Sequence, residues 1–351
     1  MPAPLPIDLE HMTAFLTGLL NIPSPTGFTE RAVAYLEAAL APLPLSVRRT
    51  QKGALVAEWA GIQHDAPRAL TAHLDTLGAL VKEIKGSGRL RLSKIGGYAW
   101  NTVEGEGCTI FTADGRAVRG TLLIAKASSH VHGAETSDMK RDDASMEVRL
   151  DELTTSEPHT RALGIQVGDY VAFDPRVETG PAGFIRSRHL DDKASVAAIV
   201  GAVRAMAAAG LQPAQRTTLH FSTYEEVGHG AAAGIPADVV ELLAVDMAAI
   251  GQGQESDEFN VTICAKDSGG PYDYELRRRL ARLAEAAGIP YKLDIYPFYG
   301  SDGEAFWRAG GDVRVGLVGP GVEASHNYER THVDALEHTA QLLVEYLRSA
   351  E

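Results

Sequence analysis

The chain has 351 residues, of which 45% are hydrophobic and 23% charged, a composition typical of a folded globular protein. At this length two domains are a better expectation than one. Acidic residues outnumber basic residues by 46 to 33, and the net charge of -13 would repel phosphate backbones and anionic membrane surfaces. Nucleic acids and membranes are therefore not expected as partners.

The sequence also bears on the cellular compartment. The first twenty residues carry Asp8, Glu10 and His11 and space their apolar residues helically, unlike a secretory signal. No uninterrupted apolar run approaches the roughly 18 residues that a spanning helix needs. The two cysteines, Cys108 and Cys264, form neither a metal-type pair nor a disulfide framework by their spacing. We expect a protein of the reducing cytoplasm.

The first part of the chain, residues 1–77, alternates between helix and strand patterns. Residues 29–43 place Val33, Leu36 and Leu40 on one face of a predicted helix. Residues 69–75, ALTAHLD, form a short apolar run typical of a buried strand, and this run ends in a histidine and an aspartate. This part predicts the beginning of an α/β domain.

After Gly78 the sequence changes to many short stretches in which apolar and polar residues alternate, and no long segment has helical periodicity. Asp114-Gly115, between CTIFTA and RAVRGTLL, is a strong signal for a β-hairpin. We therefore predict a small β domain inserted over residues 78–177.

Helix and strand patterns alternate again in residues 178–351. Helices are expected within residues 191–210, 274–290 and 332–350, and strands within residues 217–226, 239–251 and 313–320. Such alternation is typical of a mostly parallel sheet with helices on both faces. The predicted fold class is therefore α/β with an inserted β domain.

Acidic and histidine side chains gather where the predicted strands end or the helices begin. They are His73 and Asp75, Asp191 and Asp192, Glu225 and Glu226, Asp246, and His326. In open α/β sheets, ligands bind at the carboxyl ends of the strands. We therefore expect these side chains to meet at one edge of the sheet.

Histidine nitrogen and carboxylate oxygen suit zinc, manganese or cobalt, and two histidines with three carboxylates are too many ligands for one tetrahedral ion. A two-metal site needs a bridging carboxylate and a histidine and carboxylate for each ion. Glu225 is then left over to move a proton. Each motif alone also has a purely structural explanation, such as acids at a helix N-terminus. Their joint occurrence at several strand ends favours the metal site.

Five motifs in order, AHLDTLG, RHLDDKAS, YEEVGHGA, VDMA and SHNYERTH, resemble those of the tetrahedral dinuclear-metal aminopeptidases, which include the glutamyl and deblocking aminopeptidases. The resemblance runs over nearly the whole chain. It implies a catalytic domain, residues 1–77 and 178–351, interrupted by a PDZ-like or barrel-like domain at residues 78–177 that contributes to dimer contacts. It also implies a homo-oligomer, from a dimer up to a tetrahedral dodecamer, that hydrolyses short peptides.

The resemblance further implies a role for each motif residue. Two divalent ions per chain are expected, with zinc as the first choice and cobalt or manganese as alternatives. The ligands would be His73 and Asp246 for one ion, Glu226 and His326 for the other, and Asp191 as the bridge. Asp75 would orient an imidazole ligand. Glu225 would be the general base that takes a proton from the attacking water and passes it to the leaving amine.

The sequence departs from the family pattern at three places. His229-Gly230 and Lys193 stand where the family often has arginine, and SHNYERTH offers both His326 and His332 as the last ligand. We favour His326 because it comes first after the predicted strand. These variants resemble a subgroup associated with the osmolyte N-acetylglutaminylglutamine amide, so a peptidase acting on a modified dipeptide is one alternative.

Two other functions remain open at this stage. A dinuclear-metal amidase or deacylase could use the same scaffold, but it would prefer a cation or hydrogen-bond donors for a substrate carboxylate. A non-catalytic peptide-binding or assembly protein would be the alternative of another class. The presence of Glu225, an acid that binds no ion, argues against it. We therefore predict a metallo-aminopeptidase.

Overall fold

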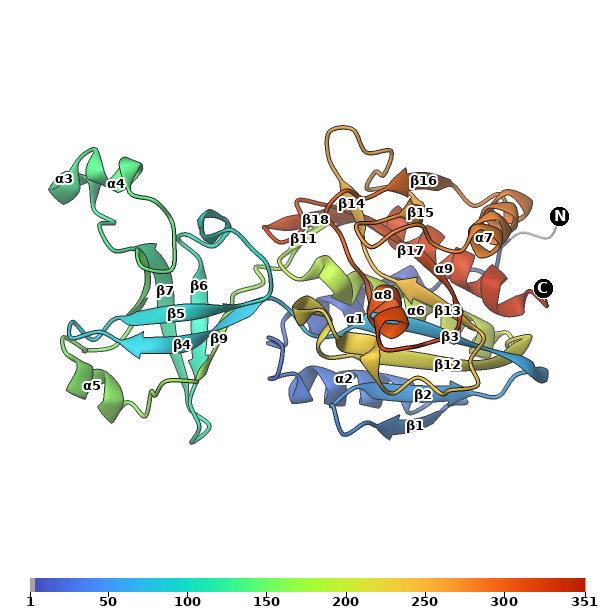
Figure 1. Cartoon of the computed structure of the whole chain (residues 1–351), viewed down its shortest axis with the longest axis horizontal. Helices are drawn as coiled ribbons and strands as arrows, with labels where there is room; N and C mark the ends of the chain where they lie inside the picture. The colour runs from blue at the N-terminus through green and yellow to red at the C-terminus, as the bar shows by residue number, and fades with distance from the viewer. Residues whose placement is uncertain (1–3, 351) are drawn as a thin grey trace.

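The computed structural model describes residues 4–350 and contains two bodies, an α/β body and a separate β-barrel (Figure 1). The chain enters the α/β body first, leaves it to form the barrel, and then returns to complete the sheet. The predicted fold class, an α/β protein with an inserted β domain, is confirmed by this arrangement.

Within the described residues, the α/β body is built on one mixed sheet of twelve strands. Its main path runs, in spatial order, through β1 (Ser46–Arg49), β2 (Leu55–Trp59), β12 (Gln215–Ser222), β3 (Gln63–His73), β13 (Glu241–Val245), β17 (Arg314–Glu323), β18 (Glu329–His332), β11 (Phe184–Ser187) and β10 (Glu178–Thr179). Three more strands join it beside β17, namely β14 (Ala248–Ile250), β15 (Val261–Lys266) and β16 (Tyr291–Ile295).

The four central strands β12, β3, β13 and β17 run parallel to one another. In β13 every residue is buried, because alternate side chains enter different cores. Leu243 and Val245 pack in the larger core, whereas Leu242 and Ala244 pack in a smaller core on the other face. Burial on both faces explains the continuous apolar runs of the sequence and fixes the carboxyl ends of these strands at one edge.

Helices cover both faces of the sheet. Those of the α/β body are α1 (Leu9–Leu20), α2 (Glu30–Leu40), α6 (Leu190–Ala208), α7 (Tyr274–Ala287), α8 (Asp302–Arg308) and α9 (Val333–Arg348). Helix α6 is alanine-rich and buried over most of its surface, because it packs against the sheet and against helices α1 and α9. Its first turn carries Asp191 and Asp192 into the interior.

The barrel closes in the order β4 (Gly78–Ile84), β5 (Leu90–Ile95), β8 (Met146–Leu150), β7 (Ala117–Ile124), β6 (Gly107–Phe111) and β9 (Tyr170–Phe173). Asp114-Gly115 lies in the turn between β6 and β7, as the sequence predicted. The short helices of this part are η1 (Trp100–Thr102), α3 (Ser129–His132), α4 (Glu135–Asp138) and α5 (Glu157–Ala162). The barrel has its own hydrophobic core, so it is a distinct structural unit.

A search of residues 4–350 finds no helix with the length and apolar character required to cross a membrane. Cys108 and Cys264 are both free and buried.

Candidate metal centre

Three neighbouring parallel strands bring candidate ligands to one edge of the sheet. Strand β3 ends at His73, β13 ends immediately before Asp246, and β12 ends shortly before Glu225 and Glu226. Since β12 and β13 both pair with β3, these strand ends lie side by side.

Asp191 lies between two histidines. Its Oδ1 is 3.1 Å from Nε2 of His73, and its Oδ2 is 3.3 Å from Nε2 of His326. Asp191 adopts φ −72° and ψ 105°, which is not helical although it lies in the first turn of α6. The peptide bond between Asp191 and Asp192 is cis. Each oxygen of one buried carboxylate thus faces a different imidazole, an arrangement suited to a carboxylate that bridges two cations.

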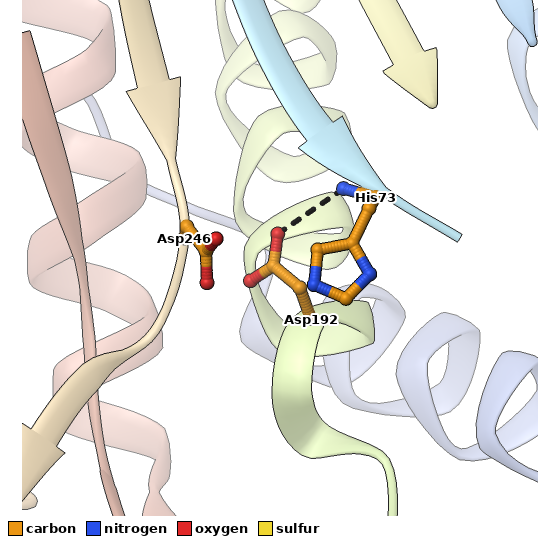
Figure 2. A group of neighbouring side chains, drawn as sticks. All are labelled: His73, Asp192 and Asp246. Carbon is orange, nitrogen blue, oxygen red and sulfur yellow. Dashed lines mark hydrogen bonds between the residues drawn. The ribbon is translucent and has the colours of Figure 1, made fainter. Parts of the chain in front are cut away.

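Two groups of side chains lie close enough to hold a metal ion. In each group the ligand atoms lie within 4.8 Å of one another, and the groups are His73, Asp192 and Asp246, and His73, Asp191 and Glu226. Figure 2 shows the first group, with Asp192 between Asp246 and His73. The sequence analysis expected Asp192 at this edge of the sheet but assigned the metal-binding role to Asp191 alone of these two acids.

The adjacent acids Glu225 and Glu226 face different histidines. Both lie in the short 3-10 helix η2 (Glu225–Val227) that follows β12. Oε2 of Glu225 is 3.8 Å from Nε2 of His73, whereas Oε2 of Glu226 is 3.7 Å from Nε2 of His326. The tight turn therefore directs two neighbouring carboxylates toward the two ends of Asp191.

Asp75 is completely buried and holds this turn in place. Its carboxylate accepts hydrogen bonds from the backbone nitrogens of Glu225 and Glu226, at 3.2 and 3.3 Å, and from the hydroxyl of Thr26 at 2.7 Å. Nδ1 of His73 lies 2.9 Å from the backbone oxygen of Asp75 and 3.6 Å from its Oδ1. Asp75 therefore contacts both the imidazole and the segment that carries the two glutamates.

Glu329, on β18, is a residue that sequence reasoning missed. Its Oε1 accepts a hydrogen bond from the backbone nitrogen of His326 at 3.0 Å, and its Oε2 accepts one from that of Asp191 at 3.2 Å. The only available signal was its position three residues after His326. The structure further links His326 to the barrel domain, because its Nδ1 donates to the backbone oxygen of Gly97.

His326, His332 and His229 all lie outside both groups of possible ligands among the described residues, but His326 differs from the other two because its Nε2 faces Asp191 and Glu226. His332 precedes α9, where its Nδ1 accepts a hydrogen bond from the backbone nitrogen of Asp334 at 3.1 Å. Its Nε2 donates to the backbone oxygen of Ala182 at 2.8 Å. The ring of His229 stacks on that of Tyr224, with centroids 5.2 Å apart.

Burial dominates the electrostatics of the centre. Burial, together with repulsion from Asp191, raises the pKa of Glu226 to about 8 and the pKa of Asp246 to about 7. Burial also raises the pKa of Glu225 well above its usual value. Although burial opposes it, hydrogen bonds from His326 and His73 hold the pKa of Asp191 below its usual value. Such crowded carboxylates are costly without nearby positive charge.

The donor set fits divalent cations. Imidazole nitrogens and carboxylate oxygens are ligands for zinc, cobalt and manganese. Oδ1 of Asp192 is buried and has no hydrogen-bond partner within residues 4–350, while its Oδ2 accepts a weak hydrogen bond from the backbone nitrogen of His73 at 3.3 Å. A buried acceptor without a donor, next to further carboxylates, is readily explained by a cation.

A cavity of about 370 Å³ opens onto this centre. It is lined by Gly97, Asp191, Glu225, Glu226, Gly228, Asp246, Met247, Phe298, Tyr299, Gly300, Ser325 and His326. The carboxylates and His326 are thus accessible to a small molecule, and the loop after β5 contributes Gly97 from the barrel side.

A parallel α/β sheet with two histidines and several carboxylates at its strand ends is the arrangement of a metal-dependent exopeptidase. The family model described as M42 glutamyl aminopeptidase matches residues 53–342. The chain therefore belongs to this family, which confirms the resemblance inferred from the motifs. It is a metal-dependent aminopeptidase, a peptide hydrolase, in a family of dinuclear-metal enzymes.

Individual relatives agree with this assignment. The chain is 48% identical to the Bacillus subtilis protein named "Putative aminopeptidase YhfE" over 94% of its own length and 95% of the relative's. The solved TET aminopeptidase of the marine archaeon Thaumarchaeota archaeon SCGC AB-539-E09 superimposes with a TM-score of 0.87, over 96% of this chain and 97% of that one, at 18% identity. The TET1 peptidase of Pyrococcus horikoshii, described as assembling into a tetrahedron or a large octahedral shell, has a TM-score of 0.84 at 21% identity, over 96% and 99% of the two chains.

Proposed function

We propose that this aminopeptidase removes the N-terminal residue of short peptides at a centre of two divalent ions. The proposal is supported above all by Asp191, whose two oxygens lie 3.1 and 3.3 Å from the imidazoles of His73 and His326. In this proposal Asp191 bridges the ions. His73 and Asp246 hold one of them, and Glu226 and His326 hold the other.

Zinc is our first choice for both ions, with cobalt or manganese as alternatives. Bound at this centre, the ions would polarise the peptide carbonyl and make a nearby water more acidic. Glu225 would take the proton of the attacking water on its carboxylate and deliver it to the leaving amine. The raised pKa of Glu225, caused mainly by burial, suits a group that must both accept and return a proton.

The lining of the cavity favours peptides with a free N-terminus over N-acylated amino acids. Its acidic side chains can bind the α-ammonium of a peptide, and among residues 4–350 it includes no lysine or arginine to pair with a substrate carboxylate. A deacylase would prefer such a cation, or hydrogen-bond donors, for the substrate carboxylate. A modified dipeptide without a free carboxylate remains an alternative substrate for the same centre.

We also propose that the chain works as a homo-oligomer in the cytoplasm. The solved structures it resembles include PhTET1-12s, described as a dodecamer, and the TET1 peptidase of Pyrococcus horikoshii, described as assembling into a tetrahedron or a large octahedral shell. A shell of this kind would restrict the interior to short peptides.

Metal analysis combined with a substrate screen tests the proposed function. We expect two divalent ions per purified chain and release of the first residue from di- to hexapeptides. Dialysis against a chelator should abolish turnover, and added zinc, cobalt or manganese should restore it. Hydrolysis of N-acylated amino acids without hydrolysis of free peptides would contradict the aminopeptidase assignment.

A further inference from the structure

Two aromatic residues line the cavity beyond the candidate metal centre. Met247 follows Asp246 directly in the chain, and Phe298 and Tyr299 come from the loop between β16 and α8. Gly300 continues this wall without a side chain. Met247 is itself only 3% exposed and packs in the larger core, so the aromatic residues Phe298 and Tyr299 supply the side-chain surface on this part of the cavity.

The loop that carries Phe298 is anchored on both sides of this residue. The hydroxyl of Ser268 donates to the backbone oxygen of Pro297 at 3.1 Å and accepts a hydrogen bond from the backbone nitrogen of Tyr299 at 2.8 Å. The hydroxyl of Tyr299 donates to the backbone oxygen of Met247 at 2.8 Å. Phe298 itself is 96% exposed. An aromatic ring is therefore held at the cavity with almost none of its surface covered, which is costly unless something packs on it.

The ammonium groups of two lysines near the cavity already donate hydrogen bonds to backbone oxygens. The ammonium group of Lys266 donates to the backbone oxygen of Asp267 at 2.7 Å, and Lys266 does not line the cavity. The ammonium group of Lys52 donates to the backbone oxygens of His229 and Gly230. An acidic substrate side chain would therefore meet no lysine or arginine among the described lining residues.

We propose that Phe298 and Tyr299 form the subsite for the first side chain of the substrate. This inference rests on the proposed aminopeptidase function and names its substrate class. The enzyme prefers peptides that begin with an apolar or aromatic residue, such as leucine or phenylalanine. Glutamate, the residue in the family description, is a poor first residue for this chain.

Aminoacyl p-nitroanilides of phenylalanine, leucine, alanine and glutamate, assayed with the metal-loaded full chain, test the preference. We expect kcat/KM for the phenylalanyl and leucyl substrates to exceed that for alanyl by about tenfold or more, since each added apolar group gains contact in the subsite. The glutamyl substrate should be slowest. Calorimetry should likewise show tighter binding of the product L-phenylalanine than of L-glutamate.

Variants of Phe298 test whether the aromatic lining of the cavity causes this substrate preference. Phe298→Ala should lower kcat/KM for the phenylalanyl substrate about tenfold, mainly through KM, and leave the alanyl substrate nearly unchanged. Phe298→Leu should restore most of the loss, and Phe298→Lys should raise the glutamyl rate relative to the leucyl rate. Phe259→Ala, at a partly exposed phenylalanine outside the cavity, is the matched control and should not alter the order of substrates.

The outcomes separate this inference from the proposed function. If the glutamyl substrate is fastest, or if Phe298→Ala slows all substrates equally, the apolar subsite is wrong while the aminopeptidase function stands. If the loaded enzyme hydrolyses none of the four substrates and no free peptide, the proposed function fails, and the inference fails with it.

Discussion

Glu225 and Glu226 are neighbours in the chain that contact opposite ends of the metal centre. The 3-10 turn after β12 and the carboxylate of Asp75 together direct Glu225 toward His73 and Glu226 toward His326. Two like charges at one strand end are therefore arranged around sites for positive charge. Their mutual repulsion would be offset when cations are bound.

Replacing Glu225 by glutamine tests its role as a base. Glu225→Gln keeps the shape of the side chain but cannot accept a proton, so we expect kcat to fall by roughly 10²- to 10⁴-fold. Metal content, measured by atomic emission, should stay at two ions per chain. Full activity of the variant would show that another group moves the proton.

Two histidines in one short segment are expected to respond differently to substitution. His326→Ala should remove a ligand and lower the metal content, because Nε2 of His326 faces both Asp191 and Glu226. His332→Ala should retain the metals and lower the free energy of unfolding by about 1 kcal/mol, since its side chain caps the first turn of α9. Metal analysis and thermal denaturation distinguish the two, and the reverse pattern would make His332 the ligand.

Lys52 supports the turn that carries Glu225 and Glu226. It lies one position before residues 53–342, which the family model matches. Its ammonium group donates to the backbone oxygens of His229 and Gly230 and lies 5.4 Å from the ring centroid of Tyr224. His229, whose role the sequence left open, stacks on the same tyrosine. The residues that Lys52 contacts lie on both sides of Glu225 and Glu226 in the sequence, because Tyr224 precedes the two glutamates and His229 and Gly230 follow them.

Lys52→Met should therefore loosen the turn without removing a ligand. We expect kcat to fall roughly tenfold to a hundredfold, with KM and metal content little changed, because the base is displaced from its working position. Lys52→Arg should recover part of the activity. Lys82→Met, at an exposed lysine of the barrel, is the control, and an equal loss in both variants would contradict a specific role for Lys52.

At the scale of elements, β18 connects the start of α6 to the turn that carries His326. Glu329 on this strand is buried and accepts a backbone hydrogen bond from both Asp191 and His326. The strand thereby fixes the distance between two candidate ligands that lie far apart in the chain. A residue with this position contributes to metal affinity without touching the ion.

Glu329→Ala is expected to weaken metal binding. The loss of both backbone hydrogen bonds should raise the dissociation constant for zinc by about 10- to 100-fold, measured by competition with a chromophoric chelator. Glu323→Ala, at an exposed end of β17, serves as the comparison. Unchanged zinc affinity in Glu329→Ala would mean that the two ligands are held by other contacts.

At the scale of the whole molecule, the barrel and the α/β body contribute to one site. Gly97, from the barrel side, lines the catalytic cavity and accepts a hydrogen bond from His326. Movement of one body against the other would therefore disturb a candidate ligand. The barrel lies to one side of the α/β body (Figure 1), and Val131 and Leu153 are exposed apolar residues of this part.

The expected oligomer can be measured directly. Analytical ultracentrifugation of the full chain should give a mass that is a multiple of 37.5 kDa, up to twelve chains for a tetrahedral assembly. Val131→Asp and Leu153→Asp should lower this mass if the exposed apolar residues of the barrel are covered in the assembly, because buried charges without partners are unfavourable. A single species of one chain mass would contradict the proposed oligomer.

The α/β class with an inserted β domain, the order of the motifs and the family can all be inferred from the sequence. Strand and helix periodicity and the position of His, Asp and Glu at strand ends are local properties that one chain displays directly. It also singled out the side chains that gather around Asp191. The division into residues 1–77, 78–177 and 178–351 and the individual metal and proton-transfer roles stay predictions.

Which distant residues support and surround the centre depends on how the elements pack together. Asp192, Glu329, Lys52 and Phe298 belong to four separate segments, and each owes its place to contacts with residues far away in the sequence. His326 and His332 are six positions apart in one motif, yet the turn between β17 and β18 brings only His326 to Asp191. Sequence patterns specify which elements form, whereas the packing of those elements sets the distances on which the chemistry depends.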